Sequence, residues 1–153
     1  MASAGRVDFP AAVMIEDRLL SLLAAWIDSN RPEGFPDSAT LPVHLANRDE
    51  LRTRPCLVLD APESKPVMAM PGTARVKLEV HLFSQADDTP AATHAQWAAS
   101  VVSLLGNKAA VRAGLDSETF VLHDLMPRES ATTPDEARGR ETVLTYEAVV
   151  TAA

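Results

Sequence analysis

Glu79 and His81 are the residues whose types and spacing best suit chemistry, because they stand two positions apart in an alternating polar and apolar segment. Positions i and i+2 of a strand face the same side, so the carboxylate and the imidazole would share one polar face. With one more ligand they could bind a metal ion. The competing interpretation is a solvated sheet face, since His44, His94 and His123 fall in other segments and no Cys/His pair has zinc spacing. We therefore expect no metal site.

Two further candidates for catalysis also have simpler interpretations. Asp87 and Asp88 resemble a paired-carboxylate site, but they directly precede Thr89 and Pro90, a pattern typical of a helix start, where negative charge is favourable. Cys56 lies in an apolar segment without a basic neighbour, which indicates a buried, inert thiol. The chain contains no nucleophile-elbow, phosphate-loop or dinucleotide-binding motif. We expect neither an enzyme nor a bound cofactor.

The element that would position these residues is segment 73–84, TARVKLEVHLFS. Its apolar residues occupy every second position and predict a central antiparallel strand with one dry face and one wet face. The dry face is expected to consist of Val76, Leu78, Val80 and Leu82. It should pack beneath two helices, against Leu19, Leu22, Trp26, Trp97, Val101 and Leu105.

Helical spacing of apolar residues predicts a first helix over residues 10–28, with residues 1–9 frayed. A second helix should start at Thr89 as N-cap and Pro90, and end before Gly106 as the C′ residue. Asn107 should cap a short helical turn, 108–113, closed by Gly114. Val43, Leu45 and Leu51 are compatible with a short strand or turn.

The other strands are predicted at residues 55–61, 120–126 and 141–151. Residues 62–72 and the polar segment 127–140 are predicted to be loops, because both contain prolines. In the last strand both faces are fairly apolar, which suggests that one face meets a partner. The expected fold is α+β: one domain, 1–153, with a mostly antiparallel four-stranded sheet, two helices on one face and a long C-terminal β-hairpin.

Composition limits the partners of this domain. The chain of 153 residues carries a net charge of −7, which argues against a nucleic-acid-binding face. A single cysteine excludes an internal disulfide and is typical of a reducing compartment. We see no signal-peptide pattern at residues 1–10 and no apolar run of about 20 residues that could span a membrane. We expect a soluble protein that is made in a cytoplasm and does not bind membranes.

The order of elements resembles the tail terminator proteins of long-tailed bacteriophages, also called tail completion or tail-to-head joining proteins. The similarity covers the chain from about residue 10. It rests on the N-terminal helix, the proline-led strand RPCLVL at 54–59, and the alternating strand at 74–83. It also rests on the helix at 91–105 with its LLG ending, the helical turn at 107–114 and the hairpin at 120–151.

The resemblance implies a structural virion protein without catalytic residues, made in a bacterial host. Members form a hexameric ring on the head-proximal end of the tail tube. The ring ends tube polymerisation, joins the tail to the head connector and lets DNA pass through its lumen. Six chains would carry six times −7, so the lumen would repel phosphates.

We expect the outer sheet face and the edge of the last strand to contact neighbouring subunits, and the polar hairpin to reach the tail tube. The interface residues expected on this basis are Arg128, Glu129, Asp135, Glu136, Arg138, Arg140, Val143, Thr145, Glu147 and Val149. Two alternatives remain at this point. One is another phage neck protein, such as a head completion, stopper or connector protein. The other is a small α+β enzyme.

Overall fold

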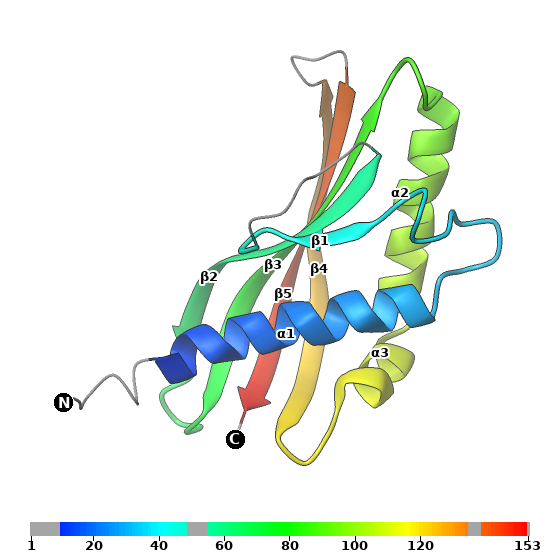
Figure 1. Cartoon of the computed structure of the whole chain (residues 1–153). Coiled ribbons are helices and arrows are strands. Elements are labelled where there is room, and N and C mark those ends of the chain that lie inside the picture. The colour runs from blue at the N-terminus through cyan, green and yellow to red at the C-terminus, as the bar shows by residue number, and fades with distance from the viewer. Residues whose placement is uncertain (1–9, 49–54, 135–138, 153) are drawn as a thin grey trace.

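A computed structural model describes residues 10–48, 55–134 and 139–152. It has an α+β fold in which three helices cover one face of a five-stranded sheet (Figure 1). The elements in chain order are α1 (Pro10–Ser29), β1 (Val43–Leu45), β2 (Cys56–Pro66), β3 (Thr73–Gln85), α2 (Ala91–Gly106), α3 (Lys108–Leu115), β4 (Phe120–Pro134) and β5 (Gly139–Ala152). Among the described helices, none is long and apolar enough to cross a membrane.

The strand order is β1-β2-β3-β5-β4, so the predicted central strand is the middle strand of the sheet. All neighbouring pairs are antiparallel except β1 and β2, which are parallel. The expectation of four strands was therefore one short. The segment after Pro42 lies alongside β2, where the Leu57 amide donates to the Pro42 carbonyl and the Ala46 amide donates to the Leu59 carbonyl. Leu51, the third residue of that predicted element, lies outside the described residues.

The inner face of the sheet, defined as the face that packs against the helices, forms the core. Its β3 residues Val76, Leu78, Val80 and Leu82 are at most 1% exposed, which confirms the predicted dry face. The buried face of α1 is rotated slightly about the helix axis relative to the predicted one. Leu20 and Ile27 are buried, whereas Leu22 and Trp26 are partly exposed. Helix α2 contributes Val101 and Leu105 as expected, with Trp97 packed at the margin.

Two predicted helix boundaries were wrong in detail. The N-cap of α2 is Pro90, with no side-chain hydrogen bond, so Thr89 does not cap this helix. Gly106 is the last residue of α2 and not a left-handed C′ residue; positive φ occurs at Gly34 and Gly72 instead. Asn107 caps α3 as predicted, since its side chain accepts a hydrogen bond from the Ala110 amide.

Helix α3 does not stop at Gly114 but runs through it to Leu115. This glycine is needed for packing, because a Cβ built on it would lie 2.1 Å from Cδ1 of Trp26 in α1. The missing side chain lets the indole ring rest directly on the α3 backbone. The predicted second helix is α2, and the helical turn predicted after it is the helix α3. The contact between Gly114 and Trp26 fixes α3 to α1.

Parts of both predicted loops are strand, although residues 67–72 form a turn as predicted. Residues 62–66 continue β2, and residues 127–134 continue β4 as a ribbon paired with residues 140–146 of β5. All residues from 127 to 134 are exposed, on both faces, so no apolar alternation marks them as a strand. Pro127 and Pro134 are tolerated because β4 is an edge strand, where a missing N–H interrupts no ladder on its free side.

Candidate functional site

The outer face of the sheet, opposite the helices, carries most of the expected interface residues. Along β5 the side chains of Val143, Thr145, Glu147 and Val149 alternate with the core residues Leu144, Tyr146, Ala148 and Val150. Val143 lies between His81 of β3 and Ala131 of β4, and Val149 lies between Arg75 and Asp124. Both valines are partly exposed, so this face combines apolar and charged side chains over β3, β5 and β4.

Arg128 and Glu129 lie at the rim of this face, at a bulge of β4. An Arg128 guanidinium nitrogen, Nη2, lies 2.5 Å from the carboxylate of Glu147 on β5. A hollow of about 390 Å³ opens beside this ion pair and is lined mainly by charged side chains of β2, β3, β4 and β5. Its charged lining consists of Glu63, Lys65, Arg75, Lys77, Arg128, Glu129 and Glu147.

Arg140 turns toward the helices instead. Its guanidinium donates a hydrogen bond of 2.9 Å to the carbonyl of Thr89, just before α2. It therefore supports the approach to α2 and does not join the outer-face group. Asp135, Glu136 and Arg138 lie outside the described residues.

The expected free edge of the last strand was wrong, because β5 is paired with β3 on one side and β4 on the other. The edges of the sheet are β4 and, at the opposite end, the short β1 with the part of β2 beyond it. Any strand-edge contact with another chain therefore has to use one of these elements. The sequence could not reveal this, because strand order depends on how distant segments pair.

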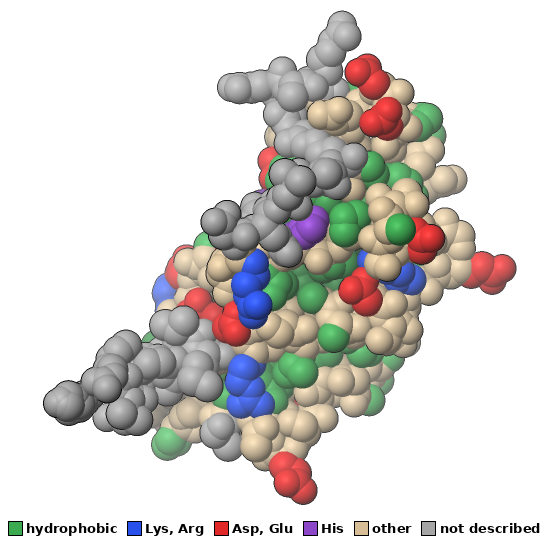
Figure 2. Space-filling view, viewed as in Figure 1, with side chains coloured by type: hydrophobic (Ala, Val, Ile, Leu, Met, Phe, Trp, Pro, Cys, Tyr) green, Lys and Arg blue, Asp and Glu red, His purple; other side chains and the backbone are tan. Residues whose placement is uncertain are grey.

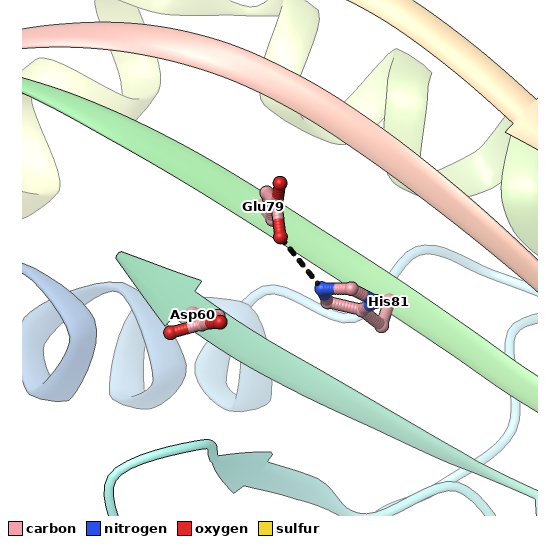
Figure 3. Close-up of side chains that lie close together, drawn as sticks. All are labelled: Asp60, Glu79 and His81. Carbon is pink, nitrogen blue, oxygen red and sulfur yellow. Dashed lines mark hydrogen bonds and ion pairs between the residues drawn. The ribbon is translucent and has the colours of Figure 1, made fainter. Parts of the chain in front are cut away.

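The Glu79–His81 pair does acquire a third residue. Asp60 pairs directly with Glu79 across β2 and β3, and the three side chains converge on the outer face (Figure 3). One ligand atom from each lies within 4.8 Å of the others. His81 Nε2 is 3.1 Å from Glu79 Oε1, and His81 Nδ1 is 2.6 Å from Glu141 Oε2 on β5. The sequence pattern identified Glu79 and His81, but Asp60 and Glu141 required the register of the sheet.

A serine–histidine pair lies on the inner face, between β3, α2 and β5. Ser84 Oγ is 2.6 Å from His94 Nδ1, and His94 Nε2 is 2.8 Å from Thr142 Oγ1. These distances suit a nucleophile and its base. However, all three residues are at most 2% exposed, so no substrate can reach the serine. Burial, and to a smaller extent the charge of Arg140, lowers the pKa of His94. The group is a neutral hydrogen-bonded link within the core.

The remaining sequence candidates offer no catalytic arrangement. Cys56 is 2% exposed, in agreement with the prediction of a buried thiol. Asp87 and Asp88 lie in the turn after β3, before the Pro90 cap of α2. The proposed capping role for these carboxylates has no side-chain hydrogen bond to support it.

The helix-covered side is shown in Figure 2. In the described part of this view, green hydrophobic side chains and tan atoms, which are other side chains and backbone, predominate, and basic and acidic side chains are scattered between them. Such a surface does not suit the phosphate backbone of a nucleic acid, which requires clustered Lys and Arg.

No protein-family model matches the chain, and no curated protein matches it either.

Proposed function

We propose that this protein is a tail terminator of a long-tailed bacteriophage, located in the virion at the head-proximal end of the tail. It would form a ring of six copies that ends tube polymerisation and joins the tail to the head connector. The observation that carries the proposal is the outer sheet face, over which no described helix packs. The order of the elements, which resembles that of this family, also supports the proposal.

The composition of the outer face is compatible with contact to another protein. Val143 and Val149 of β5 and Phe83 of β3 are partly exposed among ion pairs such as Arg128–Glu147. A non-obligate interface is about as apolar as the rest of a protein surface, so a mixed apolar and charged face can form one. In a ring, the contact is heterologous: the outer face of each subunit meets a different surface of the next, and the contacts close after six.

The ribbon formed by residues 127–134 of β4 and their β5 partners is proposed to contact the tail tube. Its paired backbone gives it a fixed shape, while its exposed side chains remain accessible. A tube that grows by adding rings stops when the last ring offers a surface that the tube protein does not fit. The ring can therefore stop growth by shape alone, without a chemical step.

The acidic charge supports the passage of DNA through such a ring. Six chains of net charge −7 repel phosphates unless basic side chains gather at the lumen. Six compact domains of this size leave a central opening of roughly 38 Å before loops intrude, by the size expected of a 153-residue globule. DNA would pass through this opening without specific binding.

The proposal is tested by the solution mass of the protein and of two matched variants. The wild-type chain should sediment at about six times 16.4 kDa and show six-fold rings in negative stain. Val149→Asp places a charge on the outer face and should yield folded monomers. Ala25→Asp introduces the same charge at an exposed position of α1, on the helix-covered side, and should leave the ring intact. A wild-type chain that stays monomeric, or a ring unaffected by Val149→Asp, would contradict the proposed contact.

A further inference from the structure

We propose that Asp60, Glu79 and His81 form a binding site for a divalent transition-metal cation such as Zn²⁺. The site lies on the outer face, where β2 and β3 run side by side (Figure 3). This proposal does not depend on the ring or on the phage assignment, because it rests only on side chains within one chain.

One ligand-to-ligand distance already matches a zinc site, and the others are within reach of it. Zinc bonds to imidazole nitrogen and carboxylate oxygen are about 2.0–2.2 Å long, so adjacent ligands of a tetrahedral site lie about 3.4 Å apart. His81 Nε2 and Glu79 Oε1 are 3.1 Å apart, near that value. The widest separation in the group is at most 4.8 Å, so it would have to close by about 1.4 Å or less to reach the same spacing.

The backbone already holds the three ligands together. Glu79 and His81 are on the same face of the central strand, and Asp60 is the direct antiparallel partner of Glu79. The ladder becomes irregular immediately after this pair, between Asp60 and Glu63. Asp60 therefore sits at the last regular position of its ladder segment, where its side chain can adjust while its Cα stays fixed opposite Glu79.

Glu141 supplies an independent reason to regard His81 as a metal ligand. Its Oε2 is 2.6 Å from His81 Nδ1, on the opposite side of the ring from Glu79. Histidines that bind metals usually donate their other N–H to a carboxylate or carbonyl, which fixes the ring and directs the free nitrogen to the metal. Here Nδ1–H would donate to Glu141, and the lone pair of Nε2 would face Glu79 and Asp60.

The charge around the group favours a cation. Asp60, Glu79 and Glu141 bring three carboxylates to one imidazole, and the nearby ammonium of Lys77 is 3.8 Å from Glu79. The side chains of His81, Glu79 and Glu141 are only 17%, 20% and 29% exposed, which weakens solvent screening. A divalent ion would offset this repulsion. The rival arrangement is a protonated His81 that donates to Glu79 and Glu141 without any metal.

The donor set indicates which metal would bind. One imidazole and two carboxylates suit Zn²⁺ better than Ca²⁺ or Mg²⁺, which prefer all-oxygen ligands. Three protein ligands leave at least one coordination position for water or for a ligand from another molecule. The site would also tie β2 to β3 on the outer face.

The test is zinc binding to the tag-free full chain after dialysis against a chelator, followed by calorimetry and metal analysis. We expect one Zn²⁺ per chain with micromolar or tighter affinity. Asp60→Asn and His81→Gln should each weaken binding at least tenfold, and Glu141→Gln should weaken it about 10- to 100-fold without abolishing it. His123→Gln is the matched control, because His123 is an exposed histidine that bonds Thr151 outside the group, and it should bind normally.

Cobalt provides a readout that is not affected by small changes in stability. Co²⁺ bound to the wild type should give the intense visible absorption of a four-coordinate site, and Asp60→Asn should lose it. The absence of zinc binding, or equal binding by wild type and Asp60→Asn, would overturn the proposal. Either result would instead favour the metal-free His81 ion-pair network, whether or not the ring forms.

Discussion

The buried His94 gives the sharpest prediction about stability. Its ring joins Ser84 on β3 to Thr142 on β5, at distances of 2.6 and 2.8 Å, and its pKa is lowered mainly by burial. Replacing His94 with leucine removes the titrating group and leaves both hydroxyls with one partner fewer. Thr142 keeps a hydrogen bond of 2.7 Å to Thr132. The variant therefore has a cost that does not depend on pH, and it lacks one acid-sensitive group.

These two effects can be separated by their pH dependence. At about pH 8 the imidazole is neutral in both the folded and the unfolded state, so His94→Leu should lower the free energy of unfolding by about 1–3 kcal/mol. Below about pH 6.5 the unfolded wild type binds a proton that the folded protein, with its lowered pKa, does not. Wild-type stability is therefore lost as the pH falls from the unfolded pKa toward the folded pKa, by up to about 1.4 kcal/mol per pH unit. The leucine variant lacks this contribution.

Urea denaturation at several values between about pH 8 and pH 5 would measure the difference in unfolding free energy between wild type and variant. This difference should shrink as the pH falls, because only the wild type loses stability through the protonation of His94 in the unfolded state. The carboxylates common to both proteins cancel in the difference. Ser84→Ala is the control: it removes a hydroxyl partner but keeps the imidazole, so it should retain the wild-type acid dependence. A difference that stays constant or grows below about pH 6.5 would refute a buried neutral His94.

Two further predictions concern packing. Leu78→Asp places a charge at a position that is fully buried under the helices and should leave the protein unfolded or insoluble. Lys77→Asp, on the exposed face of the same strand, should melt near the wild-type temperature. Equal effects in a thermal melt would disprove the assignment of the two faces. Gly114→Ala should lower the unfolding free energy by about 1–3 kcal/mol, because the new methyl group clashes with Trp26. Gly106→Ala meets no atom within 4 Å and should be neutral or stabilising. Denaturant titrations in which Gly106→Ala is the less stable variant would contradict this packing.

The elements with strong periodicity were predictable from sequence. The alternation in β3 and the apolar stripe of α1 gave the central strand and the first helix to within a residue or two. The ribbon at residues 127–134 was predicted as a loop because a strand exposed on both faces has no apolar period, and prolines normally argue against strands. Bulges add to the difficulty: Leu122 and Leu125 both reach the core although three positions apart, since β4 carries an extra residue between them.

The candidate sites were likewise predictable only where their residues lie within one strand. Glu79 and His81 were found from spacing within one strand, while Asp60 and Glu141 are contributed by the two neighbouring strands. Their positions depend on strand order and register, which follow from the pairing of residues such as Asp60 with Glu79, 19 positions apart, and from the contact of His81 with Glu141, 60 positions apart. Similarly, Val143 and Val149 were assigned to the outer face correctly from alternation, but the sequence could not show that β5 is paired on both sides.

The outer face can be tested in the assembled particle. Electron micrographs would compare tails made without this chain with tails made when the chain is resupplied as wild type or as Val149→Asp.

If the protein is the terminator, particles without it should have tails of irregular, excessive length that are not joined to heads. The wild-type chain should restore uniform joined tails, and Val149→Asp should fail to do so. Tails of normal length joined to heads in the absence of the chain would contradict the account.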